Sequence, residues 1–309
     1  MGASRWVLPR GTVSGAGFDV VVDDTVEGWR HTGLRIVTLT AGASCDVPAG
    51  EWEYAVVPLS GSVHVSARLA DGTARTAELA GRPSVFSGPT DVAYAPAGSA
   101  LVLTAAAATS RVAVCAAHVG PGGSREFRHL AASDVPVELR GAGIASREVR
   151  NFGIPGVLDA DALIACEVVT PAGNWSSYPP HKHDEEREGE ETELEEIYYF
   201  ETQVEGAAHG SDVPENADPV GYQRVYGTTE RPIDVFAQVR TGDVVLVPHG
   251  WHGPAMAAPG YDLYYLNVMA GPGPTRAWLI CDDPKHTWVR DTWRDQEIDP
   301  RLRPREEVR

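Results

Sequence analysis

Hydrophobic and polar residues alternate over many short segments of the chain, and glycine, proline, aspartate or serine separates one segment from the next. Short alternating or valine-rich runs bounded by turn residues are typical of β-strands. In the first part of the chain this pattern predicts strands at 34–39, 54–60, 62–69, 85–94 and 99–119. The last run is rich in alanine, but its β-branched residues favour two strands with a turn near Thr109 and Ser110.

A second series of strands begins near residue 144, beyond a connector at about 120–150 that contains the turn-forming sequences GPGGS and RGAG. The strands predicted in this series are 162–170, 195–204, 220–226, 233–239, 243–248 and 261–269. Sheets of this kind bury one face each by packing face to face or by closing into a barrel. We therefore expect an all-β protein with two similar halves, although no sequence repeat links them.

The composition agrees with short strands rather than with a helical bundle, because the 309 residues include 32 glycines and 23 prolines. The formal net charge of −17 argues against a nucleic-acid-binding face, which needs a basic stripe. The chain contains no run of about 18 apolar residues, so we expect no transmembrane helix. The first residues lack the apolar core of a secretory signal. The four cysteines are far apart and form no CxxC pair, so we expect thiols in a reducing compartment, the cytoplasm.

An acidic segment, DEEREGEETELEE at 184–196, holds nine carboxylates and one arginine. A run of like charges repels itself and prefers solvent, so the simpler interpretation is a solvated loop. The alternative is that the residues flanking this run belong to a functional site.

Two histidines stand immediately before this acidic segment. His181 and His183 are separated by one residue, and on a strand such residues project to the same face, so both imidazoles can reach one ion. A strand that starts with the carboxylate pair Glu195 and Glu196 follows. Only alternate residues of that strand face inward, so one of the two glutamates can be a ligand and the other should point away.

A second segment with metal-binding character lies at 241–253. A buried strand there ends in a tight turn that presents His249 and His252, and Pro248 and Gly250 fix the backbone of this turn. With one histidine taken from the turn, the two segments together supply three histidines and one glutamate. Such a donor set suits a divalent ion of Zn, Mn, Fe, Ni or Co rather than Ca or Mg.

These segments resemble the two motifs of the cupins: Gly242, Pro248, Gly250 and His252 follow the second motif, with one residue fewer before the histidine, and the first motif is stretched between His183 and Glu196. The longer strings PAGNWSSYPPHKHD, LEEIYYF, GYQRVY, GDVVLVPHGWH and YYLNVMAGP resemble the 5-deoxy-glucuronate isomerase family of bacterial inositol breakdown. The resemblance covers roughly residues 145–290 and is weaker in the N-terminal half.

The resemblance implies a bicupin, with two cupin-type β-sandwich or barrel domains and few short helices. We expect an N-terminal cupin-like domain without a metal motif at 1–140 and a C-terminal cupin domain with the metal site at 141–309. The N-terminal domain would pack against its neighbour or build a homo-oligomer. The metal ligands that the resemblance implies are His181, His183, Glu196 and His252.

The implied reaction converts 5-deoxy-D-glucuronate to 5-dehydro-2-deoxy-D-gluconate in myo-inositol catabolism, an aldose–ketose isomerisation. A proton must leave the carbon beside the aldehyde, and the resulting enediol must be stabilised, which a divalent metal can do. A carboxylate, histidine or tyrosine must move the proton. The partner is then a small uronate-type sugar acid, whose carboxylate suits an arginine fork, with neither nucleic acid nor membrane as a partner.

The candidate catalytic residues are Lys182, Arg224, Tyr199 and Tyr261, followed by Gln223, Tyr226 and Tyr264. Gln223 and Arg224 are neighbours on a predicted strand, so only one of them can point into the barrel. Weaker candidates are Arg147, Arg150, Arg276 and His286. Two other functions remain open: a cupin metallo-oxygenase, which would consume dioxygen, and a non-catalytic sugar-binding bicupin, which would lack stoichiometric metal.

Overall fold

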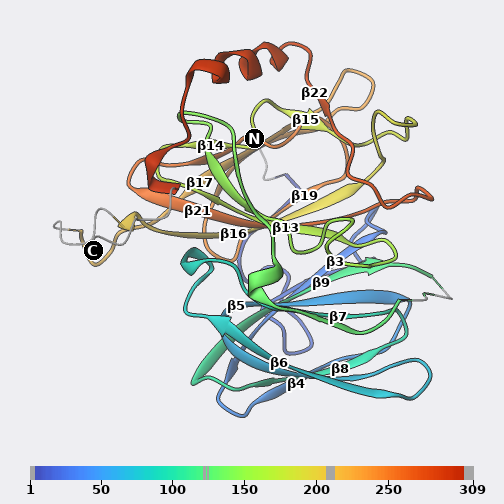
Figure 1. The fold of residues 1–309 in the computed structure, drawn as a ribbon. Helices are drawn as coiled ribbons and strands as arrows, with labels where there is room; N and C mark the ends of the chain where they lie inside the picture. Colours follow the sequence, from blue (N-terminus) through green and yellow to red (C-terminus); the bar gives the residue numbers. More distant parts are fainter. Residues whose placement is uncertain (1–3, 121–122, 124, 207–212, 303–309) are drawn as a thin grey trace.

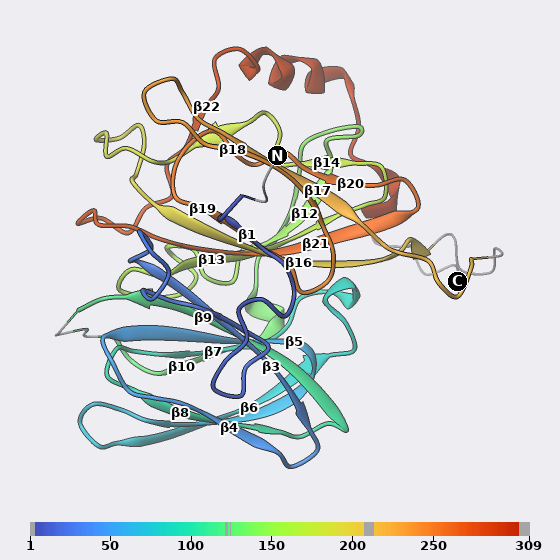
Figure 2. The same cartoon turned by 180° about the vertical axis from the view of Figure 1, so that it is seen from behind.

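The computed structural model describes residues 4–120, 123, 125–206 and 213–302. The chain forms two β-structured halves that stack on each other (Figure 1), and the view from behind shows the same two layers of curled sheets (Figure 2). This arrangement confirms the predicted all-β architecture. Within the described residues the helices are short 3-10 segments: η1 (Val85–Ser87), η2 (Ala132–Asp134), η4 (Thr287–Asp295) and η5 (Pro300–Leu302). None of them is long and apolar enough to cross a bilayer.

The N-terminal half is built on a nine-stranded sheet with the path β10-β7-β5-β9-β3-β2 and with β4, β6 and β8 attached. Its strands are β2 (Val20–Val22), β3 (Thr32–Thr40), β4 (Ser44–Val47), β5 (Trp52–Arg68), β6 (Ala74–Arg82), β7 (Val92–Ala95), β8 (Ala100–Ala105), β9 (Thr109–His118) and β10 (Arg128–Leu130). The long strand β5 pairs with β7 and β9 through its first part and with β6 and β8 through its second part. This change of partners curls the sheet around an apolar core.

The sequence pattern located β3, β5, β7, β8 and β9, whereas β2, β4 and β10 were not predicted. The predicted strands 54–60 and 62–69 are one strand, β5, whose register shifts near Gly61, a residue with a positive φ. The predicted strand 85–94 is wrong in its first part, which forms η1, and the exposed alternation of β6 was missed. The alanine-rich run does form two strands, β8 and β9, and the turn between them lies at 106–108.

The C-terminal half combines a seven-stranded sheet, β1-β19-β16-β21-β13-β12-β11, with a four-stranded sheet, β14-β20-β17-β18, and the pair β15-β22. Its strands are β1 (Val7–Leu8), β11 (Val137–Arg140), β12 (Arg147–Arg150), β13 (Ile164–Thr170), β14 (Trp175–Ser176), β15 (His181–Lys182), β16 (Glu195–Val204), β17 (Gly221–Tyr226), β18 (Asp234–Val239), β19 (Val244–Val247), β20 (Ala255–Ala257), β21 (Tyr261–Ala270) and β22 (Cys281–Asp282). Apolar side chains of the two larger sheets face each other and form the barrel core.

Two short segments of the predicted 1–140 domain pack with the C-terminal half. Strand β1 pairs with β19, with Val7 opposite Val245, and β11 pairs with β12. Strand β1 therefore extends the seven-stranded sheet, as Figure 2 shows for β1 beside β19. A third cluster of buried apolar residues joins the outer faces of the two halves and includes Trp29, Leu34, Tyr199 and Leu266.

The two halves also correspond in strand register. Glu53 stands opposite Ala117 near the start of β5, and Glu195 stands opposite Ala270 at the start of β16. In the following position, Tyr54 of the N-terminal half lies opposite Ala95, as Glu196 of the C-terminal half lies opposite Val247. A proline follows the partner residue in both halves: Pro96 follows Ala95, and Pro248 follows Val247. The repeat that the sequence did not reveal is therefore present in the pairing of the strands.

The corresponding glutamates Glu53 and Glu195 connect the halves reciprocally. Glu53 accepts backbone hydrogen bonds at 2.6–2.8 Å from residues 161–163, just before β13. Glu195 accepts backbone hydrogen bonds from residues 30–32 at the start of β3, the shortest being 2.6 Å from His31. Each half thus holds the other by a buried carboxylate that satisfies consecutive N–H groups, which rigidifies the interface because buried polar groups need such partners.

Candidate metal centre

Three buried histidines converge in the C-terminal barrel. The candidate ligand atoms of His181, His183 and His252 lie within 4.8 Å of one another. His181 and His183 share a face because one residue separates them, and His252 follows the turn after β19. The backbones of His181 and His252 exchange two hydrogen bonds, of 2.9 and 2.8 Å, which fixes the turn against β15.

Glu196 completes the group from the neighbouring strand. Its Oε2 atom lies 3.2 Å from Nε2 of His183 and 2.9 Å from Nε2 of His252. The adjacent Glu195 points to the opposite face of β16, where it binds the N-terminal half. The structure therefore brings together the four predicted ligands, and the alternation of β16 separates the two glutamates as expected.

The hydrogen bonds of the imidazoles orient them toward a common centre. Nδ1 of His183 donates to the carbonyl of Leu194 at 3.2 Å, and Nδ1 of His252 donates to the carbonyl of Gly250 at 2.8 Å. A carbonyl only accepts, so the proton resides on Nδ1 and the lone pair of Nε2 faces the centre. This is the arrangement that orients histidine ligands in metal sites.

The charges of the group also suit a cation. Burial, together with the nearby His252 and His183, holds the pKa of His181 well below its ordinary value, so this imidazole is neutral. Burial alone would raise the pKa of Glu196, but the adjacent imidazoles of His183 and His252 outweigh it and lower that pKa to about 2. Nε2 of His183, Nε2 of His252 and Oε2 of Glu196 lie 2.9–3.2 Å from one another, a spacing that matches ligands held roughly 2.1 Å from one ion. The residues present therefore fit a divalent metal.

Gly253 makes room for His181. Its φ of +104° lies in the left-handed region, and a Cβ atom there would stand 2.5 Å from Cε1 of His181 and 2.5 Å from the carbonyl oxygen of Ser177. Both distances are too short for any side chain. The glycine that follows His252 is thus a steric requirement of the histidine group.

A partly open cavity borders the histidine group. Two of the group's residues, His181 and Glu196, form one part of its wall. The remaining polar wall residues are Arg140, Arg147, Ser177, Tyr178, Tyr198, Asn267, Trp278 and Arg290, and the apolar wall includes Val149, Val168 and Ile280. A substrate in this cavity would touch the histidine group and several hydrogen-bond donors.

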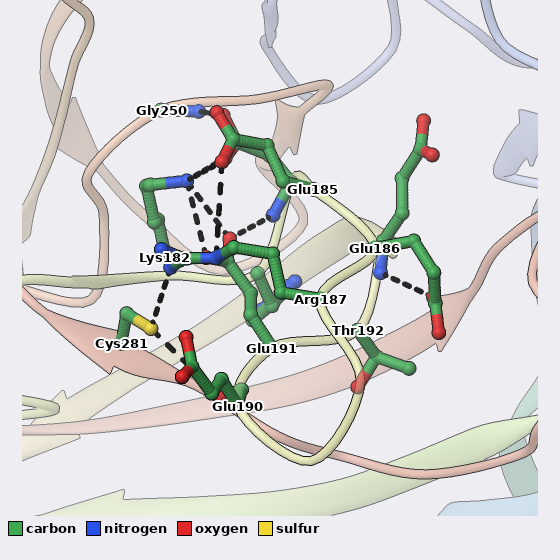
Figure 3. Close-up of polar contacts among 12 residues, drawn as sticks. Lys182, Glu185, Glu186, Arg187, Glu190, Glu191, Thr192, Gly250 and Cys281 are labelled. Atoms are coloured by element: carbon green, nitrogen blue, oxygen red, sulfur yellow. Dashed lines mark hydrogen bonds and ion pairs between the residues drawn. The ribbon is translucent and has the colours of Figure 1, made fainter.

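The four residues predicted as catalytic lie elsewhere. Lys182 points away from its two histidine neighbours and binds Asp184 at 2.6 Å and Glu191 at 2.9 Å (Figure 3). Arg224 points out of the barrel and pairs with Asp234. These two side chains serve ion pairs outside the cavity.

The two tyrosines predicted as catalytic are also remote from the histidines. Tyr199 lies in the interface between the halves, where its hydroxyl contacts Arg111 and Glu201. Tyr261 pairs with Val204, eight positions along β16 from Glu196, which is roughly 26 Å at the rise of a strand. Neither tyrosine lines the cavity.

The other candidates are distributed between the barrel and its outside. Gln223, not Arg224, points into the barrel: it is fully buried, and its side-chain amide has no hydrogen-bond partner within the described ranges. Hydroxyl groups of Tyr226 and Tyr264 bind Asp283 and Glu167. Side chains of Arg150 and Arg276 bind backbone carbonyls, His286 lies beside Tyr178, and Arg147 lines the cavity.

The sequence analysis missed several cavity residues for different reasons. Tyr198 follows Glu196 by two positions and so shares its face, which alternation alone indicates. Asn267 stands opposite Tyr198 on β21, a relation that requires the register. Arg140 and Arg290 come from β11 and η4, far apart in the chain, and no local pattern marks them.

The acidic segment 184–196 is only partly a solvated loop. Side chains at 185, 186, 188 and 190 are exposed, as expected. The expectation is wrong for Glu191, which is fully buried and binds Lys182, Arg187 and the backbone N–H of Asp184 (Figure 3). Asp184 in turn accepts a 2.8 Å hydrogen bond from the N–H of Gly250 in the turn that carries His252. The buried carboxylates therefore link this segment to the histidine group.

Comparison with known proteins gives a consistent assignment. The model of the KduI/IolB family matches residues 7–289. The 5-deoxy-glucuronate isomerase of Geobacillus kaustophilus HTA426 is 39% identical over 291 residues, which cover 94% of this chain and 96% of that protein. The 5-deoxy-glucuronate isomerase of Geobacillus thermodenitrificans NG80-2 is 38% identical over 291 residues, or 94% and 97% of the two chains.

Solved structures agree with this assignment. The crystal structure of an IolB-like protein from Salmonella typhimurium LT2 has a TM-score of 0.79 and 33% identity, and covers 93% of this chain and 99% of that one. Oxalate decarboxylase from Lactobacillus farciminis matches at a TM-score of 0.63 with 11% identity, over 92% and 90% of the chains, and so shares the cupin fold alone. The chain therefore belongs to the KduI/IolB family and is an isomerase with the fold of a bicupin.

Proposed function

We propose that the protein is a metal-dependent aldose–ketose isomerase that converts 5-deoxy-D-glucuronate to 5-dehydro-2-deoxy-D-gluconate in myo-inositol catabolism. The observation that carries this proposal is the buried group of three histidines and Glu196 at the wall of a cavity rich in hydrogen-bond donors. The relatives named 5-deoxy-glucuronate isomerase support the choice of substrate.

We propose His181, His183, Glu196 and His252 as the ligands of a divalent ion, which is Zn, Mn, Fe, Ni or Co. When bound, the ion would supply Lewis-acid stabilisation of the negative charge that develops on the substrate oxygens. We further propose a homo-oligomer in the cytoplasm, a location in which the four free cysteines stay reduced.

The protein's own residues would orient the sugar and restrict water. Tyr198 lines the cavity two positions from Glu196, and its hydroxyl can donate a hydrogen bond to a sugar oxygen. Val149, Val168 and Ile280 give the cavity an apolar wall that excludes water and strengthens the polar contacts within it. Since Lys182, Arg224, Tyr199 and Tyr261 lie outside the cavity, we assign the contacts with the substrate to the residues of its wall.

Incubation of the metal-loaded protein with 5-deoxy-D-glucuronate in deuterated water, followed by NMR, tests the proposal. We expect the ketose product, with deuterium on the new hydroxymethyl carbon where the proton exchanges with solvent. His252→Ala should abolish the reaction, and His249→Ala should retain it, because His249 lies outside the histidine group. Absence of product with the metal-loaded protein would refute the proposal, and dioxygen consumption in the same mixture would identify an oxygenase instead.

A further inference from the structure

Arg147 is a buried cation without an acidic partner. It is 8% exposed at the start of β12, on the strand face that it shares with Val149 of the barrel core. Among the described residues it makes one hydrogen bond, from Nη1 to the carbonyl of Ala145 at 3.2 Å, and no carboxylate of these residues lies within ion-pair distance. Arginine keeps its proton in proteins, so this is a charge removed from water without compensation.

The other arginines of the cavity differ from Arg147 in this respect. Arg140 pairs with Glu138 at 2.7 Å, and Arg290 forms a two-pronged pair with Asp282. Burial, with the positive charges of Arg140 and Arg290 nearby, lowers the pKa of Arg147 to about 10, so its guanidinium is still charged at neutral pH. The wall of the cavity therefore contains an unneutralised positive charge.

A second donor in the same wall lacks an acceptor. Nε1 of Trp278 is buried and has no hydrogen-bond partner in the part of the chain that the structure describes, although Trp278 lines the cavity together with Arg147. Both groups donate, and the described residues satisfy neither the charge of Arg147 nor the indole N–H. An anion with accepting oxygens would satisfy the charge and the indole N–H together.

We propose that Arg147 binds the carboxylate of the sugar acid and thereby makes the enzyme selective for uronates over neutral aldoses. This inference rests on the proposed function. It orients the substrate along the cavity, with the carboxylate at Arg147 and the aldehyde end at His181 and Glu196, which line the same cavity. A planar carboxylate matches the guanidinium fork, and a lysine would match it less well.

The decisive comparison uses a charged and a neutral substrate with matched variants. The neutral analogue is 5-deoxy-D-xylo-hexose, in which a hydroxymethyl group replaces the carboxylate. We expect Arg147→Met to lower kcat/KM for 5-deoxy-D-glucuronate by about 100-fold or more, while kcat/KM for the analogue stays near that of the unaltered protein. Arg147→Lys should lose about 10-fold, because it keeps the charge without the fork. Arg240→Met is the control, since Arg240 is an exposed partner of Asp218.

Stability and binding separate this role from a structural one. Because Arg147 is an uncompensated buried charge, Arg147→Met should not lower Tm in the absence of ligand, whereas loss of a structural arginine would. Calorimetric titration with D-glucuronate, D-glucose and inorganic phosphate measures binding even if no isomerisation occurs. Loss of D-glucuronate binding in Arg147→Met alone supports the proposal independently of catalysis.

Three results would overturn it. The first is an equal loss on the charged and neutral substrates, the second is unchanged D-glucuronate binding in Arg147→Met, and the third is phosphate binding as tight as D-glucuronate binding. Failure of the unaltered protein to isomerise 5-deoxy-D-glucuronate would instead refute the proposed function. The calorimetric binding measurements would then decide the role of Arg147.

Discussion

Glu195 and Glu196 are neighbours in sequence but serve opposite sides of β16, so their replacement by glutamine should produce different defects. Glu195→Gln alters the contact between the two halves of the protein. Glu196→Gln alters the group that would hold the ion. The two substitutions are matched in chemistry and differ by one position, which makes each a control for the other.

The magnitude for Glu195→Gln follows from its hydrogen bonds. The carboxylate accepts from the N–H groups of Arg30, His31 and Thr32 and from the Thr32 hydroxyl. A bond to a charged group contributes about 1.5–3 kcal/mol and a neutral bond about 0.5–1.5 kcal/mol. A glutamine oxygen can keep the bonds to His31 and Thr32 in neutral form, whereas its NH₂ group would meet the N–H of Arg30. Loss of the charge on two bonds, about 1–1.5 kcal/mol each, and of the third bond gives roughly 3.5–6 kcal/mol.

This loss corresponds to a measurable change in Tm. An unfolding entropy of about 2.1 cal/mol/K per residue amounts to about 0.65 kcal/mol/K for 309 residues, so Tm should fall by roughly 5–9 °C. Because a glutamine keeps the bonds to His31 and Thr32 and so still anchors β16, Glu195→Gln should change metal affinity little. Glu196→Gln should weaken metal binding by about 10–100-fold, because an amide cannot neutralise the ion.

Differential scanning calorimetry of the metal-free proteins and calorimetric metal titration measure the two effects separately. If Glu195→Gln lost the metal while Glu196→Gln retained it, both the ligand assignment and the orientation of β16 would be wrong. An unchanged Tm in Glu195→Gln would show that the bonds to residues 30–32 contribute little to stability.

Three further predictions concern the surroundings of the histidine group. His252→Ala should lose bound metal and keep the fold, whereas His249→Ala should keep the metal, as measured by elemental analysis; equal losses would show that the wrong turn residue was chosen. Gly253→Ala should also lose metal, because its Cβ would displace His181, and an unaltered metal content would refute this steric requirement. Glu191→Gln should lower the free energy of unfolding, measured in urea, chiefly near neutral pH. Burial opposes ionisation of Glu191, but the ion pair with Lys182 outweighs it and lowers the pKa of Glu191. The stabilisation by this carboxylate is therefore present above the ordinary carboxyl range and is lost as the pH falls. Replacement of the exposed Glu186, Glu188 and Glu190 by glutamine should change stability less than Glu191→Gln does and should leave turnover nearly unchanged. A roughly 100-fold loss of turnover would instead indicate that this segment forms a lid over the substrate.

Local periodicity predicted many of the longer strands and the common face of His181 and His183, whereas the choice of Glu196 and His252 as ligands came from the family resemblance. The spacing of His181 and His183 fixes a common face on any strand, and the alternation of β16 separates Glu196 from Glu195. The same rule places Lys182 between two inward histidines and therefore outward, as the structure shows. Its selection as a catalytic residue overlooked that consequence of alternation.

The cavity wall could not be predicted in this way, because tertiary packing brings it together. Arg147 on β12 and Trp278 on the segment after β21 share the cavity although they are far apart in the chain. Burial without a counterion distinguishes Arg147 from its neighbours, and no sequence pattern reports burial of that kind. The register correspondence between the halves was likewise invisible, because Tyr54 stands in the N-terminal half where Glu196 stands in the other.

The reciprocal contacts of Glu53 and Glu195 between the halves affect how accurately the proposed ligand Glu196 is positioned. Glu195 is clamped by backbone N–H groups of the N-terminal half, and the next residue along the chain is Glu196. The immobilised carboxylate thus anchors the end of β16 from outside the barrel, which restricts the directions available to the side chain on its inner face. The N-terminal half, which has Tyr54 at the position equivalent to Glu196, therefore holds β16 in place. The precision with which Glu196 is positioned beside the histidines thus depends on residues of the N-terminal half that do not contact the histidine group.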